Sequence, residues 1–341
     1  MYCTSDILCQ AAFGQDFNFL EEGCTPSHKI HKQKQLLDLL QVHMNDVRYR
    51  MLFPWTTWSL RFFSRSINSF LSSRNKARFM AHDKINAYVR EAVLERFSAM
   101  HRDPSCARCD LLDYTIMACT DPDDRGHWRE AAALETVMAN VTHFWIAGSE
   151  TSANSVSWVL FFLSTRPYWF NKCRDQILDV INKNGSNISI QTLEQMTYLK
   201  AVILETHRTK PAAPIHYSVV GNKQGFWLRD KLIPQGAKIF CMSRFAVTEA
   251  SDIYDKLSFC PQRWLEESGD LKKDLEVDPD LVFGAGPRVC LGKRMAEVEI
   301  LVIVATFLRR FRRMALRVDD AEVKERMMLT MGPSRLSVSF S

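Results

Sequence analysis

One cysteine near the C-terminus stands in a setting that suits chemistry. Cys290 lies in the segment FGAGPRVCLGKRMAEVEI, residues 283–300. Gly286 and Gly292 permit backbone conformations and close approaches that a side chain would block, and Pro287 stiffens the bend. A sulfur just before a helix N-terminus faces free backbone N–H groups and the positive end of the helix dipole, which favour thiolate over thiol. The setting indicates a nucleophile or a metal ligand, with a buried structural cysteine as the alternative.

The two chemical interpretations of Cys290 make different demands on the rest of the chain. A nucleophilic cysteine needs a base, and the sequence around Cys290 contains no recognisable Cys/His arrangement. A metal ligand needs only an iron atom and a flat slot of cofactor size. We therefore favour the ligand interpretation, and a thiol enzyme stays as an alternative.

The longest predicted helix carries a glycine that needs a reason. This helix runs from about residue 128 to 164, on the order of 55 Å at about 1.5 Å per residue, so it must cross the whole domain. Its segment AGSET, Ala147 to Thr151, places Gly148 near the helix centre, where glycine costs about 1 kcal/mol relative to alanine. Close packing against a neighbouring helix is one explanation.

A carboxylate and a guanidinium share one face of a later helix. Glu205 and Arg208 are three residues apart in LETHR, so both project from the same side. An exposed pair of this kind contributes almost nothing to stability. However, the preceding residues in AVILETHR are apolar, and a buried carboxylate must be paired and hydrogen-bonded.

These motifs resemble those of the cytochrome P450 family, the haem-thiolate monooxygenases. Phe283, Gly286, Arg288, Cys290 and Gly292 fit its haem-binding loop, FxxGxRxCxG, without a mismatch. The resemblance implies a haem cofactor (heme b, iron protoporphyrin IX) with Cys290 as the axial iron ligand. It also implies that Phe283 shields the sulfur and that Arg288 pairs with a haem propionate, in keeping with the electron push of a thiolate ligand.

The mid-helix glycine gains a second explanation from the resemblance. AGSET matches the oxygen-binding motif of the family, (A/G)GxxT. In that interpretation Ala147 and Gly148 open a groove over the iron. Glu150 and Thr151 then form an acid–alcohol pair that delivers protons during oxygen activation.

The resemblance also supplies partners for two further sites. FCPQRW, residues 259–264, matches FxPxRW, so that Arg263 joins Glu205 and Arg208 in a structural network beneath the haem. Many relatives carry a propionate-binding arginine just after the proline turn, where this chain has His216, Tyr217 and Ser218. His216 is a candidate replacement donor, and a solvent-facing strand histidine is the alternative.

The chain as a whole is predicted to be mainly α-helical with small β-sheets. Helices are expected at 28–51, 76–100, 128–164, 167 to about 185, 198–208 and 291–313, and short strands in IHYSVV, GFWL, KIFCM and LSVSF. The resemblance implies one partial cytochrome P450 domain over residues 1–341. We expect it to lack the N-terminal portion of the family fold, with its membrane anchor and first sheet strands.

Composition excludes some classes of function. A net charge of +5 over 341 residues, without a concentrated basic stripe, argues against nucleic-acid binding. No stretch reaches the roughly 18 apolar residues of a membrane span. The aromatic segment Leu52 to Phe63 is interpreted as a core or interdomain contact, with peripheral contact to a membrane interface as the alternative.

The function implied by the resemblance is the insertion of one atom of O2 into a small apolar organic substrate. Electrons would come from an NADPH–cytochrome P450 reductase, docked at Lys293, Arg294 and the arginines from Arg309 onward. The sequence is most similar to fungal members, which implies fungal secondary metabolism. Such relatives sit on the endoplasmic reticulum membrane, whereas no anchor is recognisable here. The alternative is a truncated, non-catalytic fragment with weak or no haem binding.

Overall fold

The computed structural model divides the chain into two compact units. Unit 1 is Met1–Ala153 and unit 2 is Asn154–Ser341. The structure describes residues 1–14, 19–20, 39–40, 42, 73–103, 105, 108–119, 131–185, 188–244, 258–273, 279–317, 322–327 and 330–341. Most of the helix expected at 28–51 and all of Leu52–Phe63 lie outside these residues. A single domain over 1–341 stays a prediction.

Unit 1 is helical. Its described elements are α1 (Tyr2–Phe13), α5 (Ser73–Arg102), α6 (Leu111–Cys119) and most of α7 (Ala131–Thr165). The prediction of helices near 76–100 and 128–164 is confirmed by α5 and α7. In the core, Phe13 meets Trp145 edge to face, with ring centroids 5.8 Å apart.

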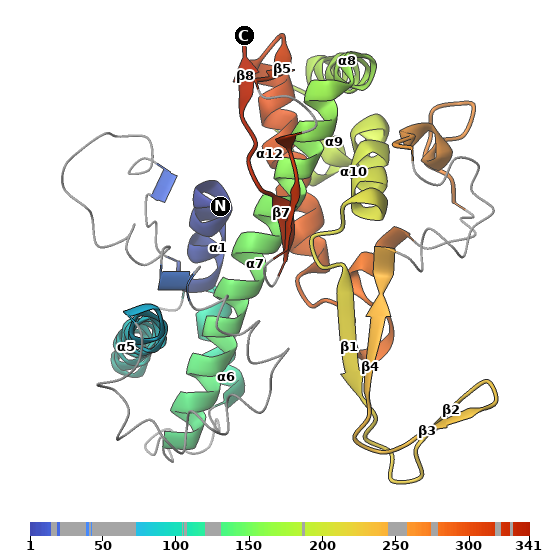
Figure 1. Ribbon diagram of the computed structural model, residues 1–341. Coiled ribbons are helices and arrows are strands. Elements are labelled where there is room, and N and C mark those ends of the chain that lie inside the picture. Colours follow the sequence, from blue (N-terminus) through green and yellow to red (C-terminus); the bar gives the residue numbers. More distant parts are fainter. Residues whose placement is uncertain are drawn as a thin grey trace. The chain divides into compact units, whose positions relative to one another are not determined.

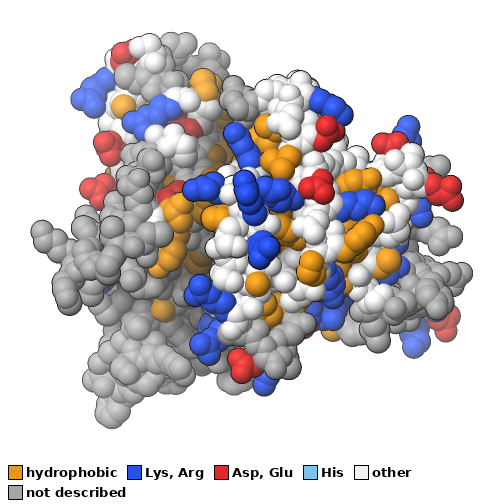
Figure 2. All heavy atoms as spheres, turned by 90° about the horizontal axis from the view of Figure 1, so that it is seen from above, with side chains coloured by type: hydrophobic (Ala, Val, Ile, Leu, Met, Phe, Trp, Pro, Cys, Tyr) orange, Lys and Arg blue, Asp and Glu red, His pale blue; other side chains and the backbone are white. Residues whose placement is uncertain are grey.

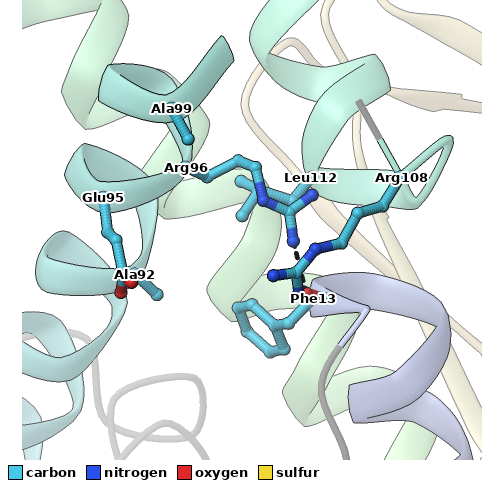
Figure 3. A pocket seen from close by; sticks show the side chains of 7 residues that line it. All are labelled: Phe13, Ala92, Glu95, Arg96, Ala99, Arg108 and Leu112. Atoms are coloured by element: carbon cyan, nitrogen blue, oxygen red, sulfur yellow. Dashed lines mark hydrogen bonds between the residues drawn. The ribbon is translucent and has the colours of Figure 1, made fainter. Parts of the chain in front are cut away.

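A buried ion cluster ties three helices of unit 1 together. Nη1 of Arg96 in α5 donates to Asp110 at 2.7 Å and to Asp113 at 2.6 Å, while its Nη2 donates to the Phe13 carbonyl at 2.6 Å. Burial alone lowers the pKa of the Arg96 guanidinium, but the hydrogen bonds to both carboxylates outweigh it and hold that pKa above its ordinary value. Figure 3 shows Arg96 and Phe13 among the residues that line a pocket.

Unit 2 packs helices against one another and carries small sheets (Figure 1). Helices α8 (Pro167–Asn184), α10 (Thr197–Thr209) and α12 (Lys293–Arg310) contact one another pairwise, and α9 (Ile190–Glu194) packs on α8 and α12. Short 3-10 turns are η2 (Pro261–Trp264), η3 (Pro279–Phe283) and η4 (Gly286–Arg288). The predicted class, mainly α with small sheets, is confirmed.

The sheets of unit 2 are antiparallel strand pairs. Among the described residues, the pairs are β1 (Ile215–Val219) with β4 (Lys238–Met242), β2 (Phe226–Leu228) with β3 (Lys231–Ile233), β5 (Met314–Leu316) with β8 (Val338–Phe340), and β6 (Glu325–Met327) with β7 (Met331–Pro333). Figure 1 shows β2 and β3 as a hairpin beyond the end of the β1–β4 pair. The strands expected in IHYSVV, GFWL, KIFCM and LSVSF are confirmed.

The predicted limits of the last helix were wrong at both ends. Helix α12 begins at Lys293 instead of Leu291 and ends at Arg310 instead of Arg313. The backbone N–H groups of Arg312 and Arg313 donate to the carbonyl of Ser341 at 2.7 and 2.8 Å. Pairing with the C-terminal strand therefore replaces the last helical turn.

Every helix in the described ranges is too short or too polar to span a lipid bilayer.

Arg96→Leu is expected to destabilise unit 1 strongly. It leaves Asp110 and Asp113 buried without their cation, a defect that costs about 3–5 kcal/mol in comparable pairs. Urea denaturation followed by circular dichroism measures the loss. The control Lys183→Ala breaks an exposed pair with Asp179 and should cost less than about 1 kcal/mol. Equal losses in both variants would contradict the assignment of Arg96 as an anchor.

Candidate functional site

The carboxylate of Glu205 is the centre of a buried network in unit 2. Its side chain is 0% exposed. Oε1 accepts hydrogen bonds from Arg208 Nη2 at 2.8 Å, Cys260 N at 2.8 Å and Arg263 Nε at 3.1 Å. Oε2 accepts from Arg208 Nε and Trp264 Nε1, both at 2.9 Å. Five donors thus satisfy both oxygens of one buried charge.

This network connects α10 to the segment around η2. Glu205 and Arg208 belong to α10, whereas Arg263 and Trp264 belong to η2. Arg208 extends the connection by donating from Nη2 to the Ser258 carbonyl at 2.8 Å. The structure therefore brings Glu205, Arg208 and Arg263 together, as the sequence motifs led us to expect.

The loop that carries Cys290 is closed by a hydrogen bond across its base. The backbone N–H of Cys290 donates to the carbonyl of Phe283 at 2.7 Å, and that of Val289 donates to Gly286 at 3.1 Å. Gly286 has φ +70°, in the left-handed region that favours glycine. Gly292 is the N-cap of α12, and a Cβ there would lie 3.9 Å from Cys290 Sγ.

The loop is open to solvent on the side of Gly286. A Cβ added at Gly286 would meet no atom within 4 Å, and residues 285–292 are exposed, among them Arg288 and Cys290. The buried structural alternative for Cys290 is therefore wrong, because its side chain is exposed. Burial, in contrast, raises the pKa of the Cys9 and Cys173 thiols well above the usual range, which keeps them neutral.

The described part of the chain contains no group of three or more His, Cys, Asp or Glu side chains able to hold a metal ion. The role of Cys290 as a ligand of a haem iron stays a prediction.

His216 has a buried ring nitrogen. It lies in β1, opposite Cys241 of β4, and its Nε2 is buried without a hydrogen-bond partner among the described residues. Buried polar atoms in proteins are rarely left in this state. The solvent-facing alternative does not hold for this atom, while the role of His216 toward a propionate stays a prediction.

The AGSET segment lies in unit 1, where its glycine serves helix packing. A Cβ at Gly148 would approach the Leu8 side chain to 2.9 Å, and Thr4 of the same helix α1 donates from Oγ1 to the Ser149 carbonyl at 2.8 Å. Close packing is therefore sufficient to explain Gly148. A contribution of Ala147 and Gly148 to an oxygen groove stays a prediction.

The acid and the alcohol of AGSET differ in their surroundings. Glu150 is buried, at 8% exposure, whereas Thr151 is partly exposed. The Thr151 hydroxyl donates to the Ala147 carbonyl, one helical turn earlier, at 2.6 Å. A threonine hydroxyl that donates one proton still has lone pairs to accept another, as a proton relay requires. The catalytic roles of both residues stay predictions.

Comparison with known proteins places the whole chain in one family. The family model described as "Cytochrome P450" matches residues 1–340. The chain belongs to the cytochrome P450 family. Its relatives include the cytochrome P450 monooxygenase traB of Penicillium crustosum, 28% identical over 95% of this chain and 57% of that protein, and cytochrome P450 2U1 of Mus musculus, 24% identical over 99% of this chain and 59% of that protein.

The fold of this cytochrome P450 agrees with that of a solved family member. The crystal structure of a cytochrome P450 (CYP102L1) superimposes with a TM-score of 0.71 at 22% identity, and covers 99% of this chain and 69% of that one. The chain thus spans somewhat less than two thirds of the length of the curated relatives just named. Family membership implies haem as the cofactor.

Two donors to Glu205 were missed in the sequence motifs of this cytochrome P450. Trp264 Nε1 and the backbone N–H of Cys260 both bond the carboxylate, although only Arg263 was assigned from FCPQRW. Trp264 stands next to Arg263 in that motif, so the signal was present. A backbone N–H carries no signal in the sequence, and the contribution of Cys260 could not have been found.

Glu205→Gln is expected to destabilise unit 2 by about 3–5 kcal/mol, because Arg208 keeps its buried charge and loses its carboxylate. Chemical denaturation measures the loss. The matched control is Glu194→Gln, since Glu194 is exposed and pairs with Arg294 only at 3.7 Å, and it should cost less than about 1 kcal/mol. A Glu205→Gln protein as stable as the control would refute the anchoring role.

Proposed function

We propose that this cytochrome P450 is a haem-thiolate monooxygenase that inserts one oxygen atom from O2 into an apolar organic molecule. The observation that carries the proposal is an exposed Cys290, in a glycine-bearing loop closed by the Phe283 carbonyl and open on the side of Gly286. A thiolate fixed in such a loop suits an axial iron ligand. Bound haem supplies the redox chemistry of iron, and the protein supplies the ligand, the proton path and the pocket.

The predicted site residues of unit 2 have distinct tasks. Cys290 binds the iron through its thiolate, and Phe283 shields the sulfur. Arg288, which is exposed, and His216, with its buried Nε2, hold the propionates by charge and hydrogen bonding. The Glu205 network touches no substrate and keeps α10 and η2 in place.

Proton transfer is assigned to Glu150 and Thr151. The Thr151 hydroxyl accepts a proton from one side and donates one on the other, and Glu150 replenishes it. The hydrogen bond from Thr151 to the Ala147 carbonyl holds the hydroxyl in one rotamer until it is needed. We assign proton delivery to this pair, and not to bulk water, because the pair directs the protons to one place.

The electron donor in the proposal is an NADPH–cytochrome P450 reductase. Arg294 in the first turn of α12 is exposed, as are Arg309, Arg310, Arg312 and Arg313 at the other end of that helix. Figure 2 shows several Lys and Arg side chains close together on the face drawn, among hydrophobic side chains and some Asp and Glu. Basic groups of this kind attract an acidic partner and speed its association.

The substrate class is an apolar organic molecule of fungal secondary metabolism. Support comes from the fungal relatives, which include a cytochrome P450 monooxygenase AMT3 of Alternaria alternata, 29% identical over 58% of this chain, and the pisatin demethylase of Fusarium vanettenii, 31% identical over 48%.

Cys290→Ala is expected to abolish thiolate ligation. The wild-type chain, purified with haem available, reduced and exposed to carbon monoxide, should give a strongly red-shifted Soret band, and the variant should not. Cys241→Ala, which removes another exposed thiol of unit 2, should keep the band. An unchanged band in Cys290→Ala would refute the ligand assignment, and no haem uptake by the wild type would favour the non-catalytic alternative.

Thr151→Ala is expected to keep the red-shifted band but to uncouple electron use from product. Loss of one relay hydroxyl should reduce product formed per NADPH on the order of 10-fold or more, with hydrogen peroxide released instead. The assay uses reductase and an apolar probe that the wild type oxidises. Ser149→Ala is the matched control, because Ser149 also donates to a carbonyl one turn earlier, that of Trp145 at 2.8 Å. Equal coupling in the two variants would contradict the assignment.

A further inference from the structure

Two side chains contact the ring of Phe283, the residue that closes the Cys290 loop. The imidazole of His207 meets it edge to face, with ring centroids 5.5 Å apart and planes at 85°. The ammonium of Lys293 lies 5.9 Å from the ring centroid. Edge-to-face pairs add stability beyond the area that they bury, and a cation near a ring adds more. His207 is only 4% exposed, so its ring is itself held in place.

The Phe283 carbonyl links the position of the Phe283 ring to the position of the Cys290 backbone. This carbonyl accepts the Cys290 N–H at 2.7 Å, across a turn in which Gly284 and Gly286 have φ +79° and +70°. Glycine enters and leaves this region of φ at little cost, so the two glycines do not by themselves hold the turn in one conformation. The position of the Cys290 backbone therefore depends on where Phe283 lies.

Helix α10 presents His207 and Glu205 to different neighbours. Residues two apart in a helix are separated by about 160° around its axis. Glu205 bonds to η2, whereas His207 meets Phe283 at the end of η3, and α10 packs against both turns. The buried network thus fixes the rotation of α10 on one side, and His207 projects from the other toward the cysteine loop.

We propose that His207 is a positioning residue for Cys290, which it holds through the ring of Phe283. Its consequence for iron ligation rests on the proposed function, but the restraint itself belongs to the haem-free chain. Neither the haem-loop motif nor the motif of Glu205 and Arg208 assigns a task to this position.

The first test is hydrogen exchange in the haem-free full chain, followed by mass spectrometry of peptides over 283–292. His207→Leu fills the position with an apolar side chain and removes the ring. It should speed exchange in this loop about 10-fold, while amides within α12 change less than about 2-fold. His207→Phe restores an aromatic edge and should stay within about 2-fold of the wild type in both regions.

Two further variants separate positioning from a general loss of stability. Ile177→Val weakens the core of unit 2 at a fully buried residue of α8, and should speed loop and α12 exchange by the same factor. Phe283→Leu removes the contact from its other partner, and should reproduce the effect of His207→Leu on the loop. This variant keeps the test decisive if His207→Leu does not fold.

The second readout is the reduced carbon monoxide spectrum of haem-loaded protein. His207→Leu should lower the red-shifted fraction, and His207→Phe should restore it. The proposal is overturned if the ring-less variants exchange like the wild type, if loop and α12 exchange rise together, or if His207→Phe behaves like His207→Leu. Since the exchange test needs no haem, a failure of the proposed haem ligation would show only in the spectrum.

Discussion

The geometry of unit 2 depends on one buried negative charge. A carboxylate without solvent is tolerated only when donors replace the water that it has lost. Glu205 has five such donors: two from the Arg208 side chain, one each from the Arg263 and Trp264 side chains, and one from the backbone of Cys260. Since each donor must reach the same two oxygens, the network leaves little freedom in how η2 meets α10.

The loop that carries Cys290 is exposed, whereas the Glu205 network is buried. Residues 285–292 of the loop are exposed, so burial contributes little to holding them, and two of its glycines lie in the left-handed region. A thiolate ligand nevertheless needs a fixed position, because a displacement of about 1 Å is costly at a catalytic centre. The order of this loop must come from its edges: the Phe283 carbonyl at one end and the start of α12 at the other.

Sequence reasoning succeeded where the relevant contacts are local. The shared face of Glu205 and Arg208 follows from helical spacing, and Pro167 and Gly185 mark the start and end of α8 as expected. It failed where distant residues decide. The carbonyl of Ser341 ends α12 early, and Cys260 reaches Glu205 through a backbone group that any residue possesses. Strands β3, β5, β6 and β7 were missed, because segments of three residues acquire their state from pairing with a neighbouring strand.

Gly148 illustrates why a motif and a packing contact need not compete. The Leu8 side chain occupies the space that a Cβ would enter, which explains the glycine without reference to oxygen. The proposed oxygen groove also requires a small residue at this position, so both explanations favour glycine. For that reason a substitution at Gly148 cannot separate the two explanations. A substitution at Thr151 can separate them, because its side chain is partly exposed and its hydroxyl donates to the carbonyl four residues earlier. Ser149, two residues before it, makes the same kind of local hydrogen bond.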